Sequence, residues 1–258
     1  DVVRTRVDIW LNPWLQPANP LLLQEVVNSR VNMQSNRISG FIQDTWTFNI
    51  DSAELLLTYG VRAVYWNYNG QVCISPRVNL SFKPNWKTDV VFRFATGMYN
   101  QPPFYKEIRA FDGTIHPEVK AQRSIHFLLG SDLNFKLWNR PFKFVGEVYY
   151  KVLDNLIPYE IDNVRLRYFA NNNGKGYATG IDLKINGEFV RGDESWLGIS
   201  LMRTREKIIG ETYTDYYNAS GEKIIQGYTV DNVAVDSIVH QPGYIPRPTD
   251  QLLNINLF

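Results

Sequence analysis

The chain has 258 residues, enough for one large domain or two small ones, and its 27 Lys and Arg against 26 Asp and Glu give a formal net charge of +1. This balance excludes a strongly basic surface for nucleic acid and an acidic solvating tail. Cys73 is the single cysteine, which excludes an intrachain disulfide and a cysteine-based metal site. Aromatic residues make up 14% of the chain, a high share that indicates either a strand-rich fold or a membrane interface.

Membrane helices and a leader peptide are not indicated. No apolar run reaches the roughly 18 residues that a spanning helix needs. Residues 1–7 lack the apolar core and small-residue cleavage site of a signal peptide. A membrane β-barrel remains possible, because the alternating apolar and polar residues of its strands give no signal when hydropathy is averaged over a window.

Apolar and polar residues alternate with a period of two in many segments, and helical periodicity is nowhere sustained. In Leu55–Tyr65, for example, Leu55, Leu57 and Val61 share one face, while Thr58 and Arg62 share the other. Such alternation is typical of half-buried strands, and we count about ten of them. The further segments with this pattern are Pro76–Lys83, Phe92–Ala95, Ser124–Gly130, Thr179–Ile185 and Leu253–Leu257.

The connections between these strands alternate in length. Short polar breaks fall near residues 49–52, 84–88, 138–141 and 187–194. Most of the others are long, at residues 11–37, 100–119, 154–175 and 206–249, with a brief exception at 67–70. Long loops are uncommon in compact soluble domains, whereas outer-membrane barrels carry short turns on one rim and long loops on the other.

Tryptophan positions favour the same interpretation. Trp46, Trp86, Trp138 and Trp196 lie in or near the four short breaks, so antiparallel strands would bring them to one rim. Tyrosines and Trp66 gather near the opposite strand ends, and two aromatic belts one strand apart are typical of a membrane barrel. The simpler alternative is that large aromatics favour strands in general.

Several segments resemble the C-terminal barrel half of TonB-dependent outer-membrane receptors, particularly those of Bacteroidetes. Their order and spacing across residues 37–205 carry the resemblance, since no single motif is specific. Asp182 stands where the family more often has Glu. The matching segments are Leu57–Arg62 ("YGVR"), Ser75–Pro84 ("SPR…L…KP"), Phe92–Pro103 ("R…G…Y…P"), His116–Glu118 with Gly130 ("PE…G"), and Gly174–Leu183 ("G…GIE").

The resemblance implies an all-β fold and a bacterial outer-membrane location. Residues 1–258 would form part of an antiparallel transmembrane barrel of about 22 strands, with short periplasmic turns and long external loops. The plug domain of such a receptor is expected outside this chain. The implied partners are that plug, a TonB-type energy-transducing protein, outer-membrane lipid and a small nutrient, with no nucleic acid. The nutrient itself stays open among siderophore, cobalamin and glycan.

Catalysis is not expected. His116, His126 and His240 lie far apart and outside any metal-ligand spacing, and the chain has no nucleophile elbow, phosphate loop or dinucleotide motif. Paired carboxylates can perform acid–base chemistry, but Glu147 and Asp182 are more simply explained as lining of the barrel lumen. We therefore expect no enzyme activity, no metal and no cofactor.

The alternation also predicts which way each side chain points. The apolar set should face lipid, and the polar set should face the lumen. The expected lipid-facing residues are Leu55, Leu57, Val61, Val78, Leu80, Phe82, Ile125, Phe127, Ile181 and Leu183. The expected lumen-facing residues are Arg62, Arg77, Asn79, Arg93, Glu147 and Asp182.

Ligand capture is expected at the long connections, because binding residues concentrate on loops held by a rigid scaffold. The candidates are Tyr99, Gln101, Tyr105, Tyr168 and Asn172, since aromatic rings and amides together suit a polar solute. For residues 168–174 the alternative is a plain loop tip that uses Asn and Gly for positive φ angles.

Two rival functions remain. A passive porin-like or structural barrel would lack a plug ahead of residue 1. A soluble all-β binding module would cover its apolar faces with protein; a carbohydrate-active enzyme is a more distant alternative.

Overall fold

The computed structural model describes residues 2–9, 21–162, 165–225, 228–247 and 252–257. All regular elements in these residues are β-strands. The strands are β1 (Val2–Ile9), β2 (Leu21–Ser29), β3 (Arg37–Ile50), β4 (Ala53–Trp66), β5 (Gln71–Lys83), β6 (Asp89–Gln101), β7 (Gln122–Leu137), β8 (Arg140–Leu156), β9 (Tyr159–Asp162), β10 (Arg165–Tyr168), β11 (Gly174–Val190), β12 (Asp193–Ile208), β13 (Tyr213–Tyr217), β14 (Asp236–His240), β15 (Ile245–Pro246) and β16 (Asn254–Leu257).

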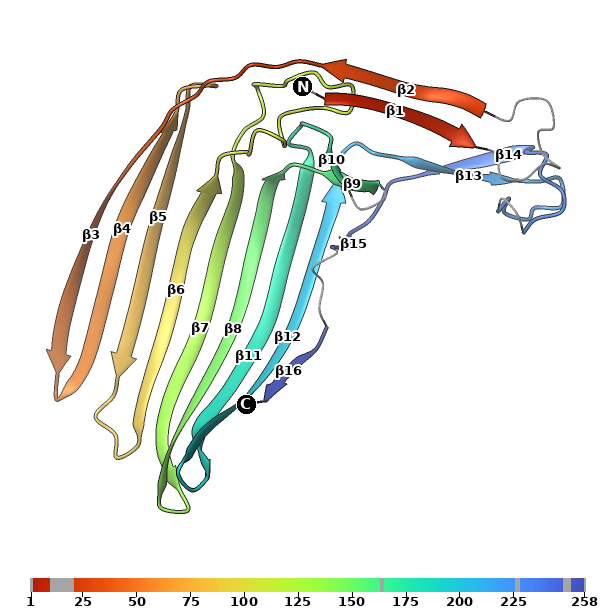
Figure 1. Ribbon diagram of the computed structural model, residues 1–258. Coiled ribbons are helices and arrows are strands. Elements are labelled where there is room, and N and C mark those ends of the chain that lie inside the picture. The colour runs from red at the N-terminus through yellow and green to blue at the C-terminus, as the bar shows by residue number, and fades with distance from the viewer. Residues whose placement is uncertain (1, 10–20, 163–164, 226–227, 248–251, 258) are drawn as a thin grey trace.

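One antiparallel sheet of ten strands dominates the described part of the chain (Figure 1). Eight long strands run in the order β12-β11-β8-β7-β6-β5-β4-β3, and the short β15 and β16 both pair with β12. Each long strand pairs with its sequence neighbours among the long strands, as in an up-and-down meander. The sheet is open between β3 and β12, so these strands form an arc of a barrel. The predicted fold class is confirmed.

The two rims of the sheet differ as expected. The turns β3–β4, β5–β6, β7–β8 and β11–β12 lie together at the lower rim, and the long connections lie at the upper rim together with the short β4–β5 turn at residues 67–70 (Figure 1). Two turns are two-residue hairpins with positive φ at both positions, Asp51–Ser52 and Trp138–Asn139, a geometry that matches the twist of the flanking strands. The β11–β12 turn is tighter than the expected 187–194 break, because both strands extend to leave residues 191–192, where Gly192 takes φ +89°.

The strand register separates the apolar and polar sets onto opposite faces. Directly paired residues share a face, and the pairs Leu57↔Leu80 and Leu80↔Phe94 continue the apolar face from strand to strand. All ten residues expected to face lipid lie on this apolar face, and the six expected to face the lumen lie on the other. Asp44 is an exception on the apolar face, where its carboxylate accepts a hydrogen bond of 2.7 Å from Trp46 Nε1.

The polar face is the concave one. A hollow of about 680 Å³ is lined by Arg37 of β3 and by Arg247, which follows β15, although these elements lie at opposite edges of the sheet. Strands between them contribute further polar-face side chains to the same hollow. The sheet therefore curls so that its polar residues surround an interior and its apolar residues point outward.

The turn-rim tryptophans are found where the sequence predicted them, with one difference in direction. Trp46, Trp86 and Trp138 are 51%, 62% and 66% exposed. Each makes an edge-to-face contact with an aromatic ring of the apolar face, as Trp86 does with Phe92. Trp196 is instead opposite Asn186 on the polar face, with the Lys184 ammonium 4.8 Å from its ring. Three of the four thus form an outward aromatic row.

The loops at the upper rim carry structure of their own, which the alternation pattern did not reveal. The expected loop 11–37 contains β2, which pairs with β1; β9–β10 and β13–β14 are hairpins inside two other long connections. Loop residues and residues at strand ends also form a small core. This core consists of Trp66, Ile108, Val119, Ile157, Tyr168 and Ala170. The described part of the chain contains no helix with the length and apolar character that a membrane crossing requires.

Candidate functional site: the concave polar face

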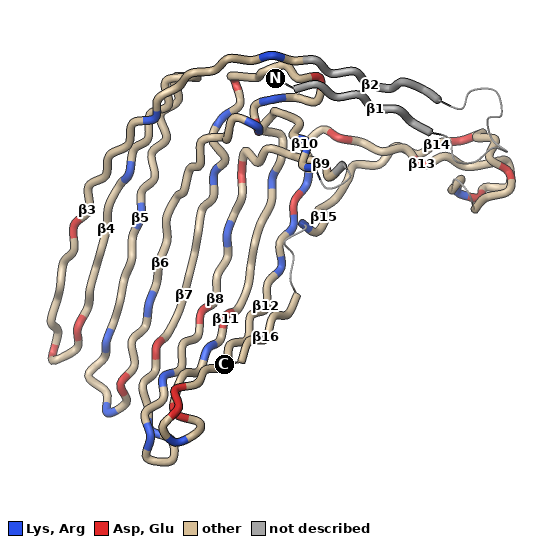
Figure 2. Tube along the Cα trace, in the orientation of Figure 1, with Lys and Arg blue, Asp and Glu red and all other residues tan. Residues whose placement is uncertain are grey.

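Charged residues occur along the long strands between the two rims (Figure 2), and on the concave face many of them are paired. Arg93 of β6 lies opposite Gly130, which leaves room for its guanidinium to reach both neighbouring carboxylates. Its Nη2 lies 2.6 Å from Asp132 and 2.8 Å from Glu147, and the Lys143 ammonium is 2.8 Å from the other oxygen of Asp132. Strands β6, β7 and β8 are thereby joined by one ion-pair network. Such a network can tie strands together.

Toward the loop rim, the hollow of about 680 Å³ adjoins a second one of about 340 Å³. Tyr99 borders both. Its ring stacks on His126 at 4.3 Å between centroids, and the Arg77 guanidinium lies 5.0 Å from its centroid. Arg62, Ser75 and Arg77 also line both hollows. The aromatic ring, hydroxyl and guanidinium groups together can contact a polar solute.

Two of the predicted capture residues lie at the mouth of this region. Gln101, at the end of β6, is exposed and lines the larger hollow. Tyr105 is 52% exposed, and its hydroxyl lies 2.7 Å from Ser35 Oγ, which also accepts a hydrogen bond from Trp66 Nε1. This chain of contacts fixes the start of loop 102–121 over the end of β4.

The other two predicted capture residues, Tyr168 and Asn172, make contacts that stabilise the loops. Tyr168 is only 9% exposed and belongs to the loop core, where it packs against Tyr159. The Asn172 side chain accepts a hydrogen bond from the Lys120 N–H and donates to the carbonyls of Lys120 and Asn155. Asn172 therefore clamps two loops together. These contacts favour a structural role for residues 168–174, although the positive φ in this stretch is at Ala170 and not at an Asn or Gly as expected.

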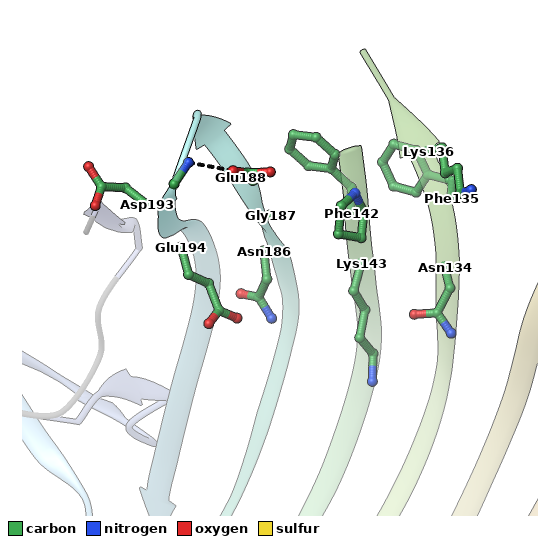
Figure 3. Close-up of a pocket in the computed structure, with 12 residues that line it drawn as sticks. Asn134, Phe135, Lys136, Phe142, Lys143, Asn186, Gly187, Glu188, Asp193 and Glu194 are labelled. Carbon is green, nitrogen blue, oxygen red and sulfur yellow. Dashed lines mark hydrogen bonds between the residues drawn. The ribbon is translucent and has the colours of Figure 1, made fainter. Parts of the chain in front are cut away.

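A third hollow, of about 820 Å³, lies at the turn rim between β7, β8, β11 and β12 (Figure 3). Its lining mixes Lys136 and Lys143 with Glu188, Asp193 and Glu194. The Gly192 N–H donates to the Glu188 carboxylate across the tight turn. Phe135 and Phe142 also line it, on the apolar side. With cations and anions interspersed and no predicted capture residue in its lining, this hollow is a weaker candidate for recognition.

The histidines do not gather. His116 is bonded to Glu118 within a loop, His126 stacks on Tyr99 in the sheet, and His240 lies 3.3 Å from Asp215 in the β13–β14 hairpin. Within the described residues, no three His, Cys, Asp or Glu side chains come together as a metal site.

Comparison with known proteins identifies the family. The family model described as "TonB dependent receptor-like, beta-barrel" matches residues 8–247. Neither a curated protein nor a solved structure matches the chain. Members of this family are outer-membrane barrels that take part in TonB-dependent transport. The match spans the described long strands and most of the loops between them, so the chain belongs to the TonB-dependent receptor-like β-barrel family.

Proposed function

We propose that this chain is part of a receptor that takes up a nutrient across the bacterial outer membrane by energy coupled through a TonB-type protein. The family match over residues 8–247 carries the proposal. The curled sheet supports it, because an apolar convex face suits lipid and a polar concave face suits a plug and water. In this arrangement the short turns face the periplasm and the long loops face outward.

Capture of the nutrient is proposed at the loop end of the concave face. Tyr99 and Gln101 provide a ring and an amide in the lining of the hollow of about 680 Å³, and the exposed ring of Tyr105 lies 5.9 Å from the guanidinium of Arg37, which also lines it. Tyr168 and Asn172 contribute indirectly, by holding the loops that carry the contacts. The proposed partners are a plug domain of the full-length protein, the TonB-type protein and the nutrient.

Uptake measurements test the function. Cells that carry or lack the full-length receptor would be offered a labelled siderophore, cobalamin or oligosaccharide, each with and without a protonophore. Energy-coupled uptake of one of these that requires the receptor is the expected result. Receptor-dependent uptake that persists in the presence of the protonophore would instead show a passive barrel.

The capture residues are tested in the same assay. Tyr105→Ala should weaken uptake, because it removes the exposed ring without touching the strand ladder. Tyr168→Ala removes a buried ring and should alter loop order first, seen as faster proteolysis of the loops. Heat-modifiable gel mobility reports whether each variant still folds as a barrel. Unchanged uptake in folded Tyr105→Ala would remove this residue from the capture site.

A further inference from the structure

The arginines on the concave face fall into two groups with different surroundings. Arg93 is bonded to two carboxylates, as described above. Arg62 and Arg77 have no carboxylate partner within the part of the chain that the structure describes, and the Arg77 Nε is buried without a hydrogen-bond partner. The same face therefore neutralises one guanidinium and leaves two others without counter-charge.

Arg62 and Arg77 are close enough to act on one group. The register places Arg62 opposite Ser75 and Arg77 opposite Gly60, so the two arginines are diagonal neighbours on adjacent strands. Diagonal residues on one face are separated by about 7–8 Å, a distance that long side chains span easily. Both guanidiniums border the same two hollows.

The lining of these hollows is one-sided in charge. No Asp or Glu lines either hollow among the described residues, while five arginines line the larger one. Three of those five have an ion pair or a hydrogen bond in this chain: Arg123 pairs with Asp154, Arg247 pairs with Glu206, and Arg37 donates to the Pro103 carbonyl and lies over the Trp66 ring. Arg37 has no carboxylate partner in the described part of the chain either, but its guanidinium is already engaged. Among the described residues, Arg62 and Arg77 are thus the two lining arginines with neither an ion pair nor a hydrogen bond.

Unpaired guanidiniums in a partly enclosed hollow suit an oxyanion. Arg binds carboxylate and phosphate through parallel N–H···O bonds, and charge-assisted bonds of this kind are about twice as strong as neutral ones. The hydroxyl of Ser75 and the ring of Tyr99 lie beside the pair and add polar and stacking contacts. We propose that Arg62 and Arg77 bind a carboxylate or phosphate group of the captured solute, so that the nutrient is an anion.

This inference rests on the proposed uptake function but is tested separately, by equilibrium binding to the purified full-length receptor. Citrate and pyrophosphate are titrated calorimetrically as probes, and neutral trehalose is the comparison at equal ionic strength. The variant is Arg62→Gln/Arg77→Gln. The matched control, Lys136→Gln/Lys184→Gln, removes the same two positive charges from the same face, at residues that line neither hollow.

The wild type and the control should bind at least one of the two anions, and the arginine variant should bind it at least tenfold more weakly. Gel mobility shows that all three proteins are folded. Absence of anion binding by the wild type would overturn the proposal, as would an equal loss in the lysine control. A structure of the full-length receptor with an acidic plug side chain bonded to both arginines would also overturn it. Because binding needs no energy source, these outcomes are independent of whether uptake proves to be TonB-dependent.

Discussion

Arginine residues that look alike in the sequence differ in role according to the residues opposite them. Arg62, Arg77 and Arg93 all occupy polar positions of alternating strands, and the alternation correctly predicted their shared face. It could not predict that Gly130 would open space beside Arg93, because that pairing joins residues from different strands. Which charges are neutralised is therefore a property of register, which one strand's sequence does not contain.

Arg93→Gln should destabilise the barrel. Removal of the guanidinium leaves Asp132 and Glu147 without their shared partner, and loss of hydrogen bonds to charged groups typically costs about 1.5–3 kcal/mol. Urea unfolding of the full-length protein, followed by tryptophan fluorescence, measures the change. Arg62→Gln is the control and should leave the unfolding midpoint unchanged. A loss of equal size in both variants would contradict a specific role for the network.

Loop 102–121 contains a carboxyl group whose titration can be predicted. A hydrogen bond from the Thr114 hydroxyl, followed by one from the Thr114 backbone N–H, lowers the pKa of Asp112. A carboxyl with a lowered folded pKa adds stability above its unfolded pKa of about 3.9, and this contribution is lost as pH falls through the folded value. Acidification should therefore loosen this turn only below the ordinary Asp range.

Thr114→Val removes the hydroxyl, which is the main cause of the lowered Asp112 pKa, and keeps the backbone hydrogen bond. The pKa of Asp112 should rise toward its ordinary value, measured by carboxyl ¹³C NMR on selectively labelled protein. The nearby Glu118 is titrated for comparison: its pKa is lowered first by its own backbone N–H, which the substitution leaves in place, and then by His116, whose ring also contacts the Thr114 hydroxyl. An unchanged Asp112 titration would show that the backbone bond alone sets its pKa.

Among the strands, the β8–β11 pair shows how glycine and aromatic residues fix a register. Gly180 is opposite Tyr149 and Gly187 is opposite Phe142, so each aromatic ring lies over a residue that has no side chain. A one-residue slip would move both rings away from their glycines. The alternation predicted β11 from Thr179 to Ile185 and missed its full extent of Gly174–Val190, because glycines carry no polarity signal.

Gly180→Ala should disturb this pair. An added Cβ would overlap the Tyr149 hydroxyl and lie 2.6 Å from the Leu201 carbonyl oxygen, which is backbone and cannot rotate away. Overpacking of this kind typically costs about 1–3 kcal/mol. Gly198→Ala is the matched control, because Gly198 lies on the same face of the neighbouring strand β12. A Cβ added at Gly198 would make only an ordinary contact with Trp196, at 3.4 Å. If both variants unfold at the same urea concentration, close packing at Gly180 is not important.

In the whole molecule, local patterns and long-range packing were predictable to different degrees. Alternation and turn chemistry are local, so the strands, the faces and the unequal rims followed from the sequence. The loop core did not, because Trp66 at the end of β4 and Ile108 and Ile157 in two separate connections are brought together only in the folded barrel. For the same reason the sequence did not predict the burial of Tyr168: its neighbours in a polar loop suggested that the ring would be exposed, but the ring is buried in this core.

The division into a lipid face and an interior face can be tested at two adjacent residues of a central strand. Val78 lies on the convex apolar face of β5 and Asn79 on the concave polar face, both near the middle of this strand. Arginine at the lipid-facing midplane of a membrane barrel costs about 2–4 kcal/mol, whereas lumen positions tolerate charge. Val78→Arg should therefore lower the free energy of unfolding by this amount, and Asn79→Arg should change it little.

The measurement is urea unfolding of the full-length receptor in lipid vesicles, with folded protein scored by heat-modifiable gel mobility. The two variants carry the same new side chain one residue apart, so the change in net charge is matched, and Val78→Thr, which keeps a β-branched side chain, controls for the loss of the valine. Detergent micelles admit water more readily than a bilayer. When the measurement is repeated in micelles, the difference in unfolding free energy between the two variants should therefore be smaller. Equal destabilisation in vesicles would mean that the convex face of β5 does not meet lipid, and a soluble arrangement with protein covering that face would then explain the apolar residues better.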